Sequence, residues 1–419
     1  MSIKQGRLKS RACGNYETRG RRNNPGGSAE TKASVVKQAT ASGQLAGKDV
    51  NYRRLPLLAL SIFALLAGLW AGLLRLGWSV PPIEDNLYII HGPLMVCGFL
   101  GTLISLERAV ALGTTFGYAA PVLSATGALA LISGRSEPIG AALINFASLC
   151  LIGDFAAILR RQTALFTVTM AFGAVAWFIG NFLWLAGAPM TGVFFWWTAF
   201  LVLTIVGERL ELSRLTGMAD RNRLSFTLSV APFIVGLFVA HKLPALGLRL
   251  AGFGMVALAL WLTRYDLARR TVKQKGLTRF IAVNLLTGYF WLGLGGAAWL
   301  WFGDNLTTFH YDIILHAVFV GFVLSMIFAH APIIFPSVLQ RPLPYRRAFY
   351  AHVALLHASL AQRIGGDLWG SYLAYRWGGL LNVVAVVMFV ANTARAVALS
   401  RSVASGQAAT PIAAHRSSG

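Results

Sequence analysis

Apolar runs of about twenty residues, the length that crosses the hydrocarbon core of a bilayer as an α-helix, follow one another from Leu55 nearly to the end of the chain. Short polar breaks separate the runs. The pattern predicts twelve membrane-spanning helices, at about 55–77, 87–110, 116–134, 138–159, 163–187, 190–210, 224–242, 244–264, 278–302, 312–336, 346–364 and 371–397. The expected fold is therefore an all-α, polytopic membrane helix bundle.

Basic residues collect in alternate connections between these runs. One set of connections holds Arg160 and Arg161, the arginines of 214–223, those of 264–279, and those of 341–347, whereas the other set is nearly free of Lys and Arg. Positive residues stay on the cytoplasmic side of a membrane protein. Both termini are therefore expected in the cytoplasm, whereas the bacterial inner membrane as the location is implied only by a family resemblance described below.

Composition agrees with this picture and divides the chain into three parts. Residues 1–54 hold twelve Lys or Arg and three acids and lack an apolar run, so they are expected to form a disordered cytoplasmic tail. The twelve-span domain covers 55–400, and a short disordered tail is expected at 401–419. The whole chain is 56% hydrophobic and 12% charged, with a formal net charge of +22. The positive charge follows topology, so nucleic acid is not an expected partner.

Candidate chemistry begins with histidines inside the apolar runs, where an imidazole is costly and by default suggests a functional site. His91 and His316 lie about five residues below the outer ends of spans 2 and 10. At 1.5 Å per residue, both lie roughly 6–8 Å below the outer surface of the core. Two imidazoles at equal depth are expected to share a cofactor, either a b-type haem with two axial histidines or a copper ion.

A second tier of histidines is expected nearer the cytoplasmic face. His330 and His352 lie at similar depth there, and His357 lies further into the membrane. Met95 stands four residues after His91, on the same helix face, and is a candidate metal ligand together with His91, His316 and His330. Each histidine also has a plainer interpretation, a hydrogen bond to a neighbouring carbonyl or hydroxyl.

Two Glu-Arg pairs end spans 2 and 6, at Glu107-Arg108 and Glu208-Arg209. The simple interpretation is that these charges reach the cytoplasmic interface and neutralise each other. The functional interpretation is a proton path, or arginines that pair with haem propionates.

The run Leu315-His316-Ala317, with Gly321 after it and Arg341-Pro342-Leu343 in the next connection, resembles the NnrS family. The match covers parts of spans 2 and 10 and their flanks. The resemblance implies a twelve-span inner-membrane protein that contains haem and copper. It also implies a role in nitric oxide metabolism or stress resistance, with nitric oxide as a ligand and a membrane electron donor.

A more distant likeness is to subunit I of the haem-copper oxidases, whose low-spin haem is held by histidines of helices two and ten. Spans 6 and 7 here contain no histidine that could hold an oxidase-type copper centre. The likeness implies a single haem and argues against oxygen reduction, and whether the chain catalyses a redox reaction stays open. Two alternatives also stay open: a secondary transporter of small solutes, and an assembly subunit of the membrane with no cofactor of its own.

Overall fold

The computed structural model describes residues 54–81, 86–134, 137–213, 220–339 and 344–408, and within these ranges every regular element is helical. The predicted tail 1–54 lies outside the described residues except for Arg54. The predicted C-terminal tail starts at 401, yet the last helix continues to Ala408, and 409–419 lie outside the described residues. The arginine-containing connection after span 10, which carries part of the NnrS resemblance, also falls largely outside them.

Helices cover all twelve of the predicted ranges. Their bounds are α2 Leu55–Arg75, α3 His91–Pro93, η2 Leu94–Gly101, α4 Thr102–Leu112, η3 Phe116–Tyr118, α5 Ala119–Ile132, α6 Glu137–Arg161, α7 Leu165–Leu185, α8 Met190–Ser213, α9 Asp220–Val239, α10 Pro244–Tyr265, α11 Ala268–Thr271, α12 Gly276–Phe302, α13 Thr308–His316, η5 Ala317–Leu324, α14 Ser325–Leu339, α15 Phe349–Trp369 and α16 Tyr372–Ala408.

Ten helical segments of the described chain are long and apolar enough to cross a membrane. The chain is therefore a multi-pass membrane protein. The two predicted spans outside this set have evident reasons to differ. Phe116–Ile132 is short, and α15 carries Arg363, Asp367 and two histidines among its apolar residues. The count of twelve spans and the side on which the termini lie stay predictions.

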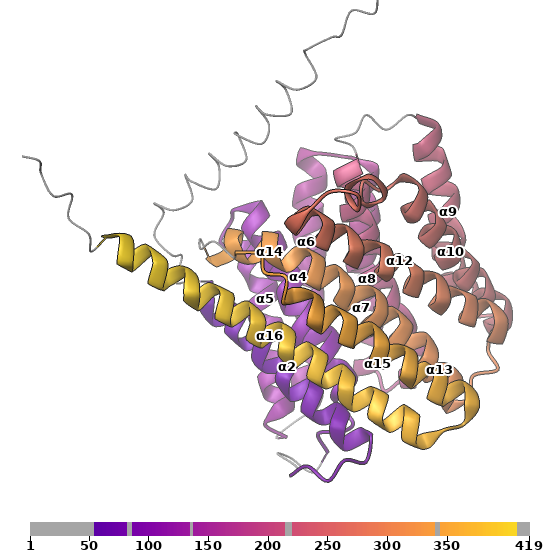
Figure 1. Cartoon of the computed structure of the whole chain (residues 1–419). Helices are drawn as coiled ribbons and strands as arrows, with labels where there is room; N and C mark the ends of the chain where they lie inside the picture. The colour runs from indigo at the N-terminus through magenta and orange to yellow at the C-terminus, as the bar shows by residue number, and fades with distance from the viewer. Residues whose placement is uncertain (1–53, 82–85, 135–136, 214–219, 340–343, 409–419) are drawn as a thin grey trace, which may run out of the picture. The chain divides into compact units, whose positions relative to one another are not determined.

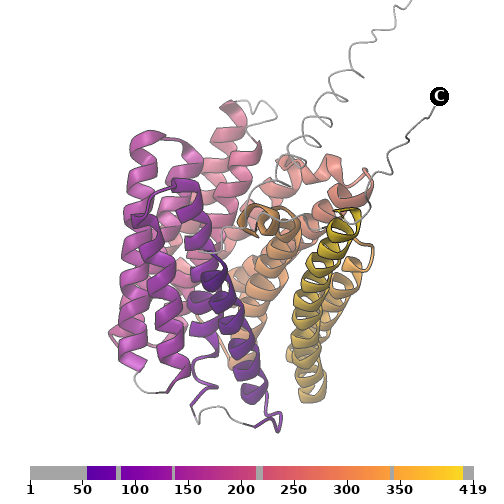
Figure 2. The same cartoon turned by 90° about the vertical axis from the view of Figure 1, so that its left-hand side faces the viewer.

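Consecutive helices pack against each other, as the short connections require. The pairs α7 with α8, α9 with α10, and α15 with α16 are extensive neighbours. The first and last long helices also meet: α2 and α16 contact each other over a short stretch, and both lie at the lower left of Figure 1 and on the side that faces the viewer in Figure 2. Residues from both ends of the chain therefore line the same cavities, which are described below.

Within the described residues, two helices contain a π-helical segment, and each segment begins within three residues after a histidine. Segment η2 begins three residues after His91, and η5 begins immediately after His316. Such segments are rare and occur frequently at functional sites. Pro93, which has no N–H to donate, contributes to the irregular turn that leads into η2.

Hydroxyl groups of neighbouring helices bind carbonyls of η2. Ser61 on α2 donates to the Phe99 carbonyl at 3.1 Å, and Ser124 on α5 donates to the Cys97 carbonyl at 2.8 Å. In a membrane, where water cannot satisfy irregular backbone, serine side chains can take over this role. The residues after His91 are thus fixed to two other helices.

Candidate functional site

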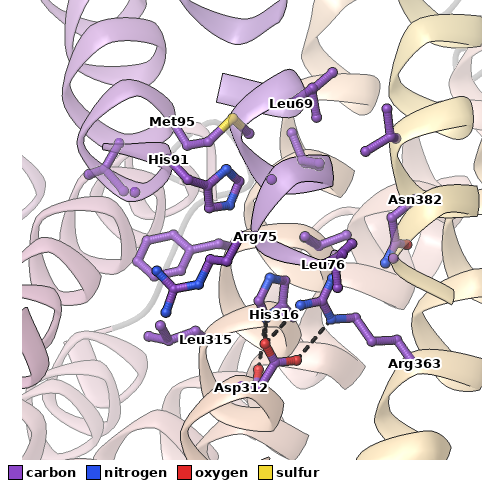
Figure 3. Close-up of a pocket in the computed structure, with 18 of the residues that line it drawn as sticks. Leu69, Arg75, Leu76, His91, Met95, Asp312, Leu315, His316, Arg363 and Asn382 are labelled. Atoms are coloured by element: carbon purple, nitrogen blue, oxygen red, sulfur yellow. Dashed lines mark hydrogen bonds and ion pairs between the residues drawn. The ribbon is translucent and has the colours of Figure 1, made fainter. Parts of the chain in front are cut away.

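A cavity of about 290 Å³ lies among α2, α3, η2, α8, α13, η5, α15 and α16, and both histidines predicted near the outer surface line it. Its apolar wall includes Leu69, Phe194, Phe319, Val383 and Val386. Its polar wall is formed by Arg75, His91, Thr308, Tyr311, Asp312, His316, Arg363, Tyr375 and Asn382. We call this space the outer cavity. Figure 3 shows His91, His316 and Arg75 around one shared space, with Asp312 and Arg363 beside His316.

The His91 ring is held by α2. Its Nδ1 lies 2.7 Å from the Gly68 carbonyl oxygen, and because a carbonyl only accepts, Nδ1 carries the hydrogen in this bond. One turn further along α2, a Cβ atom at Gly72 would lie 3.0 Å from His91 Cε1. Gly72 therefore leaves the space that the imidazole occupies.

The His316 ring is held by its own helix and by a charged pair. Its Nδ1 lies 2.9 Å from the Asp312 carbonyl oxygen and 3.2 Å from the Asp312 carboxylate. Arg363 on α15 donates to both carboxylate oxygens of Asp312, each at 2.8 Å. This chain of contacts fixes His316 with the hydrogen on Nδ1.

In the neutral form of either imidazole, a hydrogen on Nδ1 leaves Nε2 as the ring nitrogen with a free lone pair. Within the described part of the chain, no hydrogen-bond partner contacts Nε2 of His91 or of His316. Metal-binding histidines usually donate their other ring N–H to a carbonyl or carboxylate, which fixes the tautomer and the ring orientation. His91 and His316 each have this arrangement, since Nδ1 of each ring is bonded to an acceptor and Nε2 has no partner among the described residues.

Arg75 adds an unpaired cation. Its side chain lines the outer cavity, and among the described residues it has neither an ion-pair partner nor a hydrogen-bond acceptor. Arg363, in contrast, is neutralised by Asp312. The outer cavity thus offers one free guanidinium for an anionic group.

Met95 also lines the outer cavity, as the spacing from His91 predicts. Its sulfur lies against α2, where a Cβ atom at Gly68 would come within 2.8 Å of it. Among the described residues, no three His, Cys, Asp or Glu side chains form a metal-binding group. Two imidazoles and a thioether are nitrogen and sulfur groups in this cavity that could bind a metal.

The three histidines of the predicted second tier, His330, His352 and His357, have different neighbours. His330 Nδ1 lies 2.7 Å from the Met326 carbonyl, and its Nε2 lies 3.3 Å from a guanidinium nitrogen of Arg209. His352 is buried among the aromatic rings Phe280, Phe328, Phe349 and Phe389, with Asn392 at 3.3 Å from its Nδ1. His357 accepts a hydrogen bond from Trp291 at 3.0 Å. None of these three rings lines the outer cavity.

The Glu-Arg pairs form two ion-pair groups near the opposite end of the bundle. Arg108 contacts Glu107 at 2.9 Å and Glu208 at 2.6 Å. Arg209 donates to both carboxylate oxygens of Asp266, at 2.8 and 3.0 Å. Both guanidinium groups are already compensated, and neither residue lines the outer cavity.

Arg75, Asp312 and Arg363 were not predicted as site residues, although the sequence contains signals for them. Arg75 and Arg363 are basic residues near the ends of predicted spans 1 and 11 that are expected to face outward, against the expected charge pattern. Asp312 precedes His316 by four residues, the spacing that places a carboxylate beside an imidazole on one helix face.

A family model described as Domain of unknown function (DUF8744) matches residues 54–398, which include every residue of the outer cavity. No curated protein and no solved structure matches the chain. The match spans most of the sequence, and the chain belongs to the family described as Domain of unknown function (DUF8744).

Proposed function

We propose that this chain is a haem-binding protein of a bacterial inner membrane, with twelve spans and both termini in the cytoplasm. The observation that carries the proposal is the pair His91 and His316, which line one cavity with Nδ1 bonded and Nε2 available. Two imidazoles on separate helices are the donor set of a b-type haem with two histidine ligands.

The residues of the outer cavity divide the tasks of holding such a group. His91 and His316 supply the two nitrogen donors, Arg75 pairs with a propionate, and the apolar wall excludes water from the ring. The Asp312–Arg363 pair increases the electron donation of His316 through its Nδ1–H. Bound haem would supply one-electron chemistry.

A copper ion is the second candidate, and Met95 is the observation that favours it. A thioether and imidazoles suit copper, and Cu(I) in particular favours soft sulfur donors. Met95, His91 and His316 line the same cavity from η2, α3 and α13.

The resemblance to the NnrS family supports a role in nitric oxide metabolism or stress resistance, with electrons from a membrane donor. We infer no oxygen reduction, because spans 6 and 7 contain no histidine that could hold an oxidase-type copper centre. Secondary transport and a cofactor-free assembly role are the alternatives that the following experiment separates.

The deciding measurement is the visible spectrum of detergent-purified protein, oxidised and reduced, with iron and copper analysis. Wild type is compared with His91→Ala, His316→Ala and the control His310→Ala. His310 lies on the same helix as His316, is half-buried against Phe302, and does not line the cavity.

A Soret band that both cavity substitutions abolish and the control preserves would support the haem. Copper without iron, lost in both cavity variants, would support the second candidate. A well-folded, colourless protein without iron or copper would overturn both, and transport assays would then follow.

A further inference from the structure

A second cavity, of about 340 Å³, lies deeper in the bundle along the same two helices. We call it the inner cavity. It is lined by Leu58, Ser61, Ile62 and Leu65 of α2, Phe99 of η2, Leu103 of α4, Ile327, Ala331 and Ile334 of α14, and Phe389, Val390, Thr393, Ala394, Val397 and Ala398 of α16. Within the described chain, its lining contains no charged side chain.

We propose that the inner cavity binds an uncharged, lipid-soluble molecule that carries a hydrogen-bond acceptor and enters from the bilayer between α2 and α16. The inference requires neither haem nor copper, and it extends beyond the function proposed above. The volume lies near the lower end of the range for small-molecule pockets, so the ligand is small or inserts only one part.

The position of the cavity supports entry from lipid. Both α2 and α16 belong to the candidate membrane spans and lie on the side of the bundle that faces the viewer in Figure 2. Ala394 and Ala398 line the cavity and are themselves exposed. Small exposed residues at the wall leave an opening at membrane depth, where a charged molecule would be strongly disfavoured.

Two hydroxyl groups line this otherwise apolar space, and they differ in their partners. Ser61 is engaged with the Phe99 carbonyl. Thr393 is a buried residue, and its hydroxyl makes no hydrogen bond among the described residues. The hydroxyl oxygen keeps some accessible surface, and the residue lines the cavity. An acceptor oxygen on a ligand would give this hydroxyl the partner that an apolar space otherwise denies it.

Phe99 connects this cavity to the outer one, because its side chain belongs to the lining of both. A molecule bound in the inner cavity therefore lies one aromatic ring away from the space between His91 and His316. The bilayer provides this molecule with a route toward the outer cavity that avoids the aqueous phase.

The test uses benzophenone, an uncharged, lipid-soluble ketone that inserts into nearby C–H bonds on illumination. The full-length protein in liposomes is illuminated with benzophenone, and adducts are located by peptide mass spectrometry. Four proteins are compared: wild type, Ala394→Trp, Ala391→Trp and Thr393→Val. Ala391 and Ala394 are both exposed and one turn apart on α16, but only Ala394 lines the cavity.

In wild type we expect adducts concentrated on the lining residues of α2, α14 and α16. Ala394→Trp should remove them, Ala391→Trp should preserve them, and Thr393→Val should reduce them several-fold. Adducts spread evenly over exposed faces of all helices, or unchanged in Ala394→Trp, would overturn the site. Enrichment that Thr393→Val leaves unchanged would overturn the requirement for an acceptor and indicate an acyl chain as the occupant. None of these outcomes depends on the metal content.

Discussion

Asp312 and His316 lie one helical turn apart on α13, and the Asp312 carboxylate lies 3.2 Å from His316 Nδ1. The same carboxylate accepts two hydrogen bonds from Arg363. A negative charge beside one histidine and none beside the other makes the two candidate ligands electronically different, although both bond a backbone carbonyl through Nδ1.

Replacing this carboxylate by an amide should change a bound haem without removing it. Asp312→Asn keeps the shape of the side chain but loses the negative charge, which stabilises the oxidised state. We expect the midpoint potential of the haem to rise in a spectroelectrochemical titration. Asp304→Asn, at an exposed position before α13, is the control. An unchanged midpoint potential in Asp312→Asn would show that the Asp312 carboxylate does not act on the haem through His316.

The Asp312–Arg363 pair should also show the stability pattern of a buried ion pair. Removing one partner, as in Arg363→Met or Asp312→Leu, leaves a charge uncompensated in the bundle, which costs about 3–5 kcal/mol. The double variant leaves neither charge and should recover most of the loss. Thermal unfolding of the three variants in detergent measures this. Additive losses in the double variant would contradict the pairing.

Arg75 should shift the potential in the opposite direction. Arg75→Gln removes a positive charge from the outer cavity, and we expect a lower haem midpoint potential and lower haem content. Arg376→Gln is a suitable control, because Arg376 lies on the outer part of α16, bonds the Gly77 carbonyl and does not line the cavity. Equal effects of the two variants would mean that Arg75 has no specific role toward the cofactor.

The space at Gly72 provides a test of ring position that leaves both histidines intact. Gly72→Val places a branched side chain where even a Cβ atom lies 3.0 Å from His91 Cε1. It should reproduce the spectrum of His91→Ala. At Gly192 on α8 an added Cβ would meet nothing within 4 Å, so Gly192→Val should retain the wild-type spectrum. Retention of the Soret band in Gly72→Val would argue against His91 as a ligand.

The topology prediction can be checked with reporters fused along the chain. A green fluorescent protein after residue 419 should fluoresce, because both termini are expected in the cytoplasm. Periplasmic alkaline phosphatase should be active when fused after Gly187 or Gly303, and inactive after Arg161. Alkaline phosphatase that is active when fused after residue 419 would place the C-terminus outside the cytoplasm and contradict an even number of spans.

Much of the fold follows from local composition, since an apolar run in a membrane has few alternatives to a helix. The depth of a residue also follows from sequence, because helix rise is constant, and this placed His91 and His316 at one level. The rotation of each helix about its own axis is harder to predict from the sequence. His330 and His352 share a depth, yet one ring meets Arg209 and the other lies among phenylalanines. Residues that act through distant partners, such as Arg363 on Asp312, require the packing of α15 against α13 to be known.

The π-helical segments after His91 and His316 have a consequence for tolerance to insertions and deletions. A π-helical turn closes its hydrogen bond over one more residue than an α-helical turn. Deleting a single residue from η2 would let the helix relax to α-helical geometry, at about 100° per residue. The span would remain long enough to cross the bilayer, but His91 would face a different neighbour. Insertion of this helix into the membrane and the direction of the His91 imidazole are therefore separable properties. The extra residue in the π-helical turn determines the direction of the imidazole.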